Sequence, residues 1–320
     1  MRSRVVMVAA CAFAGGMAIA QDYPTRPVTV VVPFSAGSAS DVMARIVLDR
    51  MVAPFGQRFV VDNRPAAGGN VGTAAVVKAA PDGYTLLVSA SGPLAANKTL
   101  YKDLGYDPER DLQPISLFAS LPNIVVASAK LPVTTLSELI DYARKKPNVP
   151  YGSVGNGSSQ HLAGAYFEQV AGVRMSHVPY RVTAQLVADL VAGEVPVSFQ
   201  LGPNVIGQIK SAQVRPLAVA TSKRLSALPD VPTAAEAGTP GFESAAWFAF
   251  LAPRGTPRPI VERLYREIAA AMADPAVRSR FADYCAEPLT STPEELGRHI
   301  SSEIAKWREI ITKAGITLEP

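Results

Sequence analysis

The feature that most constrains the fold of this chain is a recurring order of apolar run, glycine- or serine-rich turn and amphipathic segment. Residues Val28 to Phe34 form a continuous apolar and β-branched run, which is typical of a strand buried on both faces of a sheet. The turn residues Ser35 to Asp41 follow, and apolar residues from Val42 to Met51 then recur at helical spacing. Strands that alternate with helices in this way predict an α/β fold with parallel sheets.

The same order continues along the chain in two series. The first series predicts further strands at 59–62 and 86–89 and a helix at 68–78. The second predicts strands at 123–127, 150–154, 177–179, 196–201 and 215–220, and helices at 136–145, 160–170 and 184–191. Residues 228–232 and 238–241 are too rich in proline and glycine for regular structure. A strand at 247–251 and three helices at 257–273, 275–284 and 293–314 complete the pattern.

The length of 320 residues suggests two domains, at about 100 to 200 residues for each. Two α/β series without a repeat of about 20 to 50 residues predict two lobes, not a solenoid. Ligands of such sheets usually bind in a cleft, against loops at the carboxyl ends of the strands. We therefore expect a ligand cleft between the two lobes.

The first twenty residues have the pattern of a secretory signal peptide. Arg2 and Arg4 precede an apolar run, and a small-x-small sequence ends at Ala20, so cleavage is expected near Ala20. A faint lipobox that ends at Cys11 leaves lipid anchoring as the alternative to release into the periplasm. Removal of the leader leaves Cys285 alone, which excludes an intramolecular disulfide.

The charge pattern argues against a partner that is strongly anionic. The chain has 31 Lys and Arg against 27 Asp and Glu, and two of the arginines lie in the predicted leader. The remaining basic residues are scattered along the sequence. Neither nucleic acid nor a membrane surface is therefore an expected partner.

The signatures of several enzyme classes are absent from the sequence. It has no G-x-S-x-G elbow, no H-E-x-x-H and no P-loop. His161 and His177 have no neighbouring Cys or His that would complete a metal site, so neither a metal nor a cofactor is expected. A secreted α/β serine hydrolase using Ser158 or Ser159 with His161 remains the alternative, because such sites are recognised by geometry.

Three glycine-rich loops each follow an apolar strand and precede an amphipathic helix: 37–40, 68–72 and 155–159. Backbone N–H groups at helix starts lack intrahelical partners and carry partial positive charge, which suits a carboxylate or phosphate. None of the loops has the complete dinucleotide-binding pattern. Tight α/β turns also need Gly and Ser for structural reasons alone, so one loop by itself decides little. Two such loops that face each other from separate lobes would favour anion capture.

A series of short motifs runs in order through essentially the whole mature chain. The motifs are Tyr23–Pro27, Val32–Gly37 with Asp41, Asn63–Pro65 with Gly68–Asn70, Pro81–Leu87, Tyr151–Ser153 before Gly155, His161–Gly164, His177–Tyr180, Leu228–Thr233 and Ala252–Pro253. This series resembles the Bug family, the periplasmic solute receptors of tripartite tricarboxylate transporters.

The resemblance implies a two-lobed type II periplasmic-binding-protein fold with a ligand cleft between the lobes. Lobe 1 would comprise 21–121 and 246–320, and lobe 2 would comprise 122–245. Such a receptor is a monomer without enzymatic activity. It captures a small organic carboxylate and delivers it to integral-membrane transporter subunits. The lobes would close by rotation about strands that cross near 116–123 and 243–251.

The resemblance also implies which residues line the cleft. The first ligand loop comprises Phe34, Ser35, Ala36, Gly37, Ser38, Ala39, Ser40 and Asp41. The second runs from 155 to 161, with Gly155, Asn156, Gly157, Ser158, Ser159 and His161 as its candidate ligand residues. Segments 89–92 and 180–184, with Ser89, Ser91, Tyr180, Thr183 and Ala184, complete the cleft. In this family backbone amides, hydroxyls and bridging waters hold the carboxylate, which agrees with the lack of Arg and Lys in the two loops.

Individual residues have competing interpretations. Asp41 either stabilises the start of its own helix or contacts the ligand directly. His161 is expected to order its loop by hydrogen bonding. Trp247 and Phe248 are expected to pack at the hinge or in the core instead of stacking on a ligand.

The sequence departs from the family pattern at several places around the cleft. Ser38 replaces a glycine of the first loop, and Val182 and Gln185 replace a glycine and a proline of the second lobe. Pro196 stands where an acidic residue is usual. These departures leave the identity of the carboxylate open.

Overall fold

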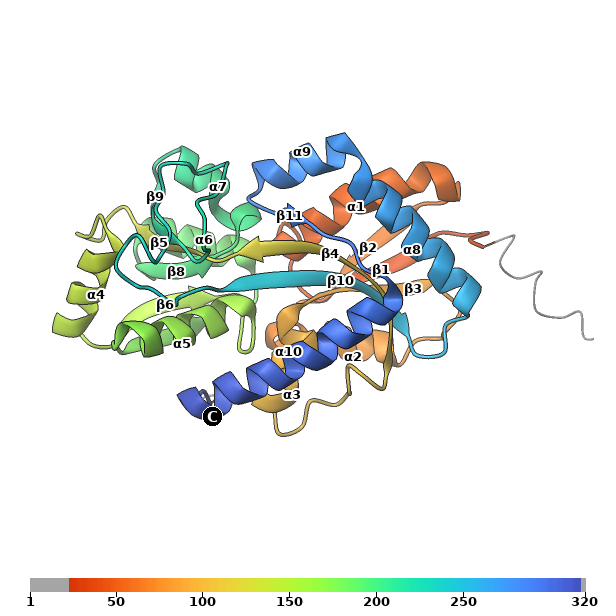
Figure 1. Cartoon of the computed structure of the whole chain (residues 1–320), viewed down its shortest axis with the longest axis horizontal. Helices are drawn as coiled ribbons and strands as arrows, with labels where there is room; N and C mark the ends of the chain where they lie inside the picture. The colour runs from red at the N-terminus through yellow and green to blue at the C-terminus, as the bar shows by residue number, and fades with distance from the viewer. Residues whose placement is uncertain (1–22, 318–320) are drawn as a thin grey trace, which may run out of the picture.

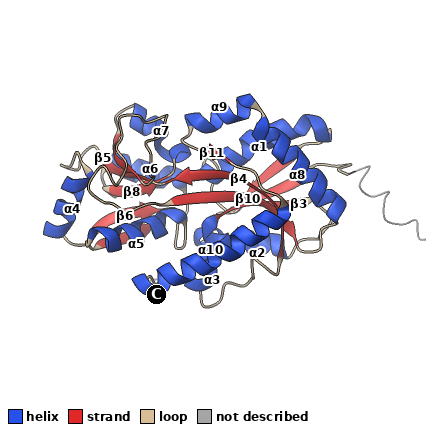
Figure 2. Cartoon of the chain, viewed as in Figure 1, coloured by secondary structure: helices blue, strands red, loops and turns tan. Residues whose placement is uncertain are grey.

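The computed structural model describes residues 23–317, which form two β-sheets that lie side by side (Figure 1). Figure 2 shows helices on both sides of the strands. The predicted signal peptide lies outside the described residues. Within residues 23–317, no helix has both the length and the apolar composition that are needed to cross a membrane.

The first sheet has six strands in the order β11-β4-β10-β3-β1-β2. These strands are β1 (Val28–Val32), β2 (Phe59–Asn63), β3 (Thr85–Ala90), β4 (Leu112–Pro122), β10 (Ala245–Pro253) and β11 (Glu287–Pro288). Strand β1 pairs in parallel with β2 and β3, whereas β10 pairs antiparallel with β3 and β4, and β11 antiparallel with β4. The prediction of a parallel sheet is therefore right for β1 to β3 and wrong for the other three strands.

The second sheet has five strands in the order β7-β6-β8-β5-β9. They are β5 (Ile124–Ser128), β6 (Val149–Ser153), β7 (Met175–Pro179), β8 (Val197–Gln200) and β9 (Val214–Val219). Strand β6 is parallel to β7 and β8, but β5 is antiparallel to β8 and β9. Both sheets are thus mixed, because strands that arrive from the other sheet run against the βαβ strands.

The predicted helices are present, with small shifts at their ends. Those of the first half are α1 (Ala39–Phe55), α2 (Asn70–Val77), α8 (Arg258–Ala273), α9 (Pro275–Asp283) and α10 (Pro293–Ala314). Those of the second half are α4 (Leu136–Lys145), α5 (Ser159–Ala171) and α6 (Thr183–Ala192). Further helices that the sequence did not predict are η1 (Ala67–Gly69), η2 (Gly92–Ala96), α3 (Asn97–Leu100) and α7 (Gly202–Lys210).

Each sheet has its own core of aromatic and aliphatic side chains. In the first half the rings of Phe118 and Phe250 lie 4.8 Å apart, and both side chains are fully buried. In the second half the rings of Phe167 and Phe199 lie 5.3 Å apart and are equally buried. Two separate cores allow each half to hold its own loops in place.

Two long strands, β4 and β10, run side by side across the middle of the molecule and lead from one sheet to the other (Figure 1). Asn123 lies where β4 passes into β5, and its N–H donates to the carbonyl oxygen of Ser244 over 2.9 Å. Ser244 in turn donates its N–H to Ala220 over 3.0 Å. The connections between the sheets are therefore bonded to one another at one place.

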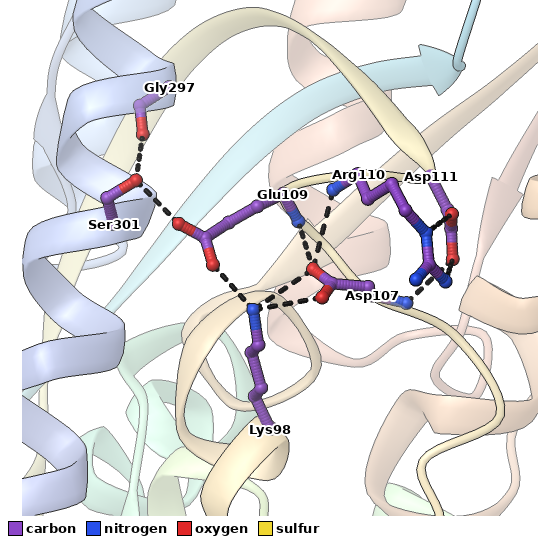
Figure 3. Close-up of polar contacts among 7 residues, drawn as sticks. All are labelled: Lys98, Asp107, Glu109, Arg110, Asp111, Gly297 and Ser301. Atoms are coloured by element: carbon purple, nitrogen blue, oxygen red, sulfur yellow. Dashed lines mark hydrogen bonds and ion pairs between the residues drawn. The ribbon is translucent and has the colours of Figure 1, made fainter.

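A polar network fixes the short helix α3 to its surroundings (Figure 3). The ammonium group of Lys98 lies 3.0 Å from Asp107 and 2.6 Å from Glu109, and the hydroxyl of Ser301 on α10 donates to Glu109 over 2.7 Å. The hydrogen bonds from Lys98 and Ser301 hold the pKa of the Glu109 carboxyl below its usual value. The network thus steadies Asn97 and Tyr101, which face the second half.

Candidate functional site

The two loops that the sequence singled out have the same local construction. Ser38 caps α1 and Ser158 caps α5, with φ and ψ of −69° and 163° in the first and −69° and 159° in the second. Each serine hydroxyl accepts a hydrogen bond from the N–H three residues later, from Asp41 over 3.5 Å and from His161 over 3.3 Å. Both loops thus satisfy one free helix N–H in the same way.

The residue before each cap is a glycine with a positive φ. Gly37 has φ of 76° and Gly157 has φ of 77°. The N–H of Gly37 donates to the carboxylate of Asp41 over 2.9 Å, and the N–H of Gly157 donates to Nδ1 of His161 over 3.1 Å. Asp41 and His161 therefore have equivalent positions, and each ties its loop to the first turn of the helix.

This construction leaves the N–H groups of the first two helical residues free in both loops. Those of Ala39 and Ser40 in α1, and of Ser159 and Gln160 in α5, donate to no atom in the described part of the chain. Such groups carry the partial positive charge of a helix N-terminus. All four are therefore available to an anion.

The four residues line one cavity between the two halves, which we call the central cavity. Its volume is about 20 Å³. The lining residues are Phe34, Ser38, Ala39, Ser40, Ala90, Gly92, Pro93, Val154, Ser158, Ser159, Gln160, Leu201, Asn204 and Phe248, and none of them is charged. A space of this size holds about one water molecule, so a larger ligand requires the halves to move apart.

A second space, the outer groove, opens between the halves beside the central cavity. Its volume is about 350 Å³. Predicted site residues that line it are Phe34, Ser35, Gly155, Asn156, Tyr180 and Thr183. Those that line the central cavity are Phe34, Ser38, Ala39, Ser40, Ser158 and Ser159. The rest line neither space, namely Ala36, Gly37, Asp41, Ser89, Ser91, Gly157, His161 and Ala184.

Several lining residues of the central cavity were not singled out in the sequence. Gln160 lies within the predicted second ligand loop but was not among its candidate ligand residues. It is the second residue of α5, so the capping pattern around Ser158 was enough to predict its free N–H group. Leu201 and Asn204 belong to the start of α7. This helix was not predicted, because the Gly-Pro pair at its start is also typical of a turn. Pro93 and Val154 carry no signal in the sequence that separates them from ordinary core residues. Phe248 was expected to pack at the hinge or in the core, and it is buried, but it also lines the central cavity.

The two halves touch at several places around these spaces. The hydroxyls of Ser35 and Thr183 lie 3.0 Å apart, and the N–H of Thr183 donates to Ser35 over 3.1 Å. The hydroxyl of Tyr101 donates to the carbonyl oxygen of Asn156 over 3.0 Å. A Cβ atom on Gly92 would overlap the carbonyl oxygen of Gly157, so glycine permits this close approach. The structure thus has its halves closed onto one another.

The carboxylate of Asp41 is occupied within its own half. Its oxygens accept hydrogen bonds over 3.0 Å from Arg45 and from Asn63, and over 2.9 Å from Gly37. Burial alone would raise the pKa of Asp41, but these hydrogen bonds and the charge of Arg45 hold it below its usual value. Of the two interpretations of Asp41, the geometry favours stabilisation of the loop and helix start.

His161 faces away from the central cavity and packs against His177. Their ring centroids lie 4.1 Å apart. Burial lowers the pKa of His161 to about 4 and, together with the neighbouring His161, that of His177 to about 3. Both rings are therefore neutral near pH 7. For His161 the hydrogen bond from Gly157 also requires this, because Nδ1 accepts it.

The serine hydrolase arrangement is not present in the structure. The hydroxyl of Ser158 is bonded to the backbone N–H of His161, and that of Ser159 donates to the side chain of Gln160 over 3.1 Å. Neither hydroxyl is bonded to the His161 ring. The described residues also contain no group of three His, Cys, Asp or Glu side chains that could hold a metal ion.

Comparisons with known proteins identify the family. Residues 43–316 match the family described as the tripartite tricarboxylate transporter family receptor. The BugT protein of Bordetella pertussis is 37% identical over 302 residues, which cover 94% of this chain and 93% of BugT. The chain belongs to this receptor family.

Solved structures of other members have the same fold as this receptor. R. palustris Rpa4515, solved with adipate, is 39% identical, with a TM-score of 0.90 over 92% of this chain and 99% of that one. MatC from Rhodopseudomonas palustris, solved with malate, is 33% identical, with a TM-score of 0.86 over 90% and 100% of the two chains. The receptor thus has the periplasmic-binding-protein fold that its motifs predicted.

Proposed function

We propose that this receptor binds a small organic carboxylate in the central cavity and delivers it to the membrane subunits of a tripartite transporter. One observation carries the proposal: the matched starts of α1 and α5 bring four residues with unpaired N–H groups to the lining of one uncharged space. Backbone donors of this kind bind carboxylates without a cationic side chain. The adipate and malate bound to the two relatives are carboxylates of the class that we propose.

The lobes that close over the ligand follow the two sheets. We assign 21–121 and 246–320 to lobe 1 and 122–245 to lobe 2, because strands β5 to β9 all fall in the latter range. The hinge lies around Asn123 and Ser244, where the connections between the lobes are bonded to one another. Rotation there would separate Ser35 from Thr183 and open the central cavity to solvent.

The receptor acts by reversible binding and not by turnover. We place it in the periplasm as a monomer, after cleavage of a signal peptide near Ala20. The bonding of Ser158 and Ser159 supports this proposal, because the hydroxyl of Ser158 caps a helix and that of Ser159 is bonded to Gln160. Neither hydroxyl is hydrogen-bonded to the His161 ring, the base that would make it a nucleophile.

A thermal-shift screen of the mature protein against organic acids tests the proposal. A ligand at about 100 times its dissociation constant adds about 2.7 kcal/mol to the free energy of unfolding, so a true ligand raises the melting temperature clearly. The acid recovered after denaturation should be chemically unchanged. A screen in which every class of carboxylate leaves the melting temperature unmoved, while a non-anionic compound raises it, would contradict the proposal.

A further inference from the structure

One side chain that lines the central cavity has an acceptor atom without a partner. Asn204 is the third residue of α7, is only 8% exposed and lies at the cavity with the starts of α1 and α5. Its Oδ1 atom is buried and has no hydrogen-bond partner among the described residues. A buried acceptor without a donor lowers the stability of the folded protein. Its position beside the ligand site suggests that the acceptor is used when the ligand binds.

The orientation of the Asn204 amide is fixed by a chain of buried hydrogen bonds. The hydroxyl of Ser198 donates to the carbonyl oxygen of Gly152 over 2.6 Å, because a carbonyl oxygen only accepts. The hydroxyl oxygen of Ser198 accepts a hydrogen bond from Nε2 of Gln200 over 2.8 Å. The side-chain oxygen of Gln200 in turn accepts a hydrogen bond from Nδ2 of Asn204 over 2.8 Å.

The consequence of this chain is that Asn204 presents an acceptor and not a donor. Turning the amide of Asn204 would bring its oxygen against the oxygen of Gln200, and turning Gln200 would bring its oxygen against a hydroxyl already used as a donor. Ser198 and Gln200 are both fully buried, so water does not relieve such a mismatch. Oδ1 is therefore held as the free end of the chain.

The central cavity thus combines two kinds of polar group. The starts of α1 and α5 supply N–H donors, which match the oxygens of a carboxylate. Asn204 supplies an acceptor, which a second carboxylate oxygen does not satisfy. A ligand that satisfies both must carry a hydrogen-bond donor as well as a carboxylate.

We infer that Asn204 makes this receptor selective for hydroxy- or amino-substituted carboxylates over the unsubstituted acids. The inference rests on the proposed function, because it assumes that the ligand binds in the central cavity. A hydroxyl or an ammonium group of the ligand donates to Oδ1 of Asn204 when the lobes close. An unsubstituted acid leaves that atom buried and unpaired, and therefore binds more weakly.

Calorimetric titration of the mature protein with matched acids tests the inference. The sets are propionate, lactate and alanine; succinate, malate and aspartate; and tricarballylate with citrate. Within the set that binds, the hydroxy or amino acid is expected to bind at least about tenfold more tightly than the unsubstituted acid, which is the effect of one hydrogen bond. Comparison of the hydroxy acid with the amino acid shows which donor the site accepts.

Substitution of Asn204 assigns the selectivity to this residue. Asn204→Leu keeps the approximate size of the side chain and removes the acceptor, so the preference should fall to within about twofold while the unsubstituted acid keeps its affinity. Gln208→Leu, one turn further along α7 and outside the cavity, should retain the wild-type preference. Melting temperatures show whether each variant is folded. If Asn204→Leu does not fold, the preference of the wild-type protein among the matched acids still tests the inference.

Several outcomes would overturn the inference. Equal affinity for substituted and unsubstituted acids in the wild type would contradict it and leave the proposed function intact. An equal loss for every acid in Asn204→Leu would mean that Oδ1 holds a water molecule and does not select the ligand. Failure of all carboxylates to bind would remove the proposed function and the inference together.

Discussion

A Cβ atom on Gly157 would overlap the side-chain oxygen of Asn97, and these two residues belong to opposite halves of the molecule. Gly157 also has φ of 77°, so a side chain there strains the backbone by about 1 to 3 kcal/mol as well as obstructing closure. Gly157→Ala should therefore lower both the melting temperature and the affinity for ligand.

Gly37 provides a matched control for this substitution. It has nearly the same φ, 76°, and the same place before a helix cap, but no heavy atom lies within 4 Å of a Cβ atom built on it. Gly37→Ala should lose a similar amount of stability and keep its affinity. An equal loss of affinity in both variants would show that the contact with Asn97 does not control closure.

The size of the central cavity predicts a change in molecular shape on binding. A space of about 20 Å³ does not admit a carboxylic acid of several carbons, so the ligand-free protein must visit an open form. Solution scattering should show a smaller radius of gyration with saturating ligand than without it. Identical profiles would mean that the lobes do not move apart, contrary to the proposed hinge near Asn123.

The neutral pair of His161 and His177 predicts a loss of stability in mild acid. Both groups have a pKa in the folded protein, about 4 and about 3, below the usual value of about 6.5 that applies when unfolded. Between pH 6.5 and 4 the unfolded chain therefore takes up protons that the folded protein does not. The histidines favour folding fully above pH 6.5 and progressively less as the pH falls toward 4.

Urea unfolding at pH 6.5 and pH 4.5 measures this effect. His161→Asn keeps an acceptor for the N–H of Gly157 and removes the titration of this ring, leaving that of His177, so it should lose less stability across this interval than the wild type. Carboxylates such as Asp41 titrate in both proteins and drop out of the comparison. If the two proteins lost the same stability, the buried histidines would not titrate as described.

The order of strands and helices was largely predictable from the sequence, but strand direction was not. The run Val28–Phe34 and the capping pattern at Ser38 predict a strand and a helix directly, because burial and capping are local properties. An apolar run such as Trp247–Leu251 reads the same in either direction, which is why the antiparallel pairing of β10 was missed. Helix α7 was missed because its first residues, Gly202 and Pro203, also mark turns.

The parts of the candidate site that are helix starts could be predicted from the sequence. The parts that depend on contacts between distant segments could not. The loops that begin α1 and α5 were found from their glycine and serine content, and the structure brings both to one cavity. The equivalence of Asp41 and His161 was hidden, because a carboxylate and an imidazole share no sequence pattern although each accepts from a glycine N–H. The unpaired oxygen of Asn204 depends on residues of β6 and β8 that only the folded chain brings together.

The most direct test of the account follows the backbone amides themselves. In a ¹H–¹⁵N correlation spectrum of the mature protein, titration with a carboxylate that raises the melting temperature should shift the amide signals of Ala39, Ser40, Ser159 and Gln160. The shifts should saturate together at one equivalent, because both helix starts hold the same anion. A bound carboxylate that leaves these four amides unmoved, or that shifts those of only one helix, would contradict the claim that α1 and α5 capture it jointly.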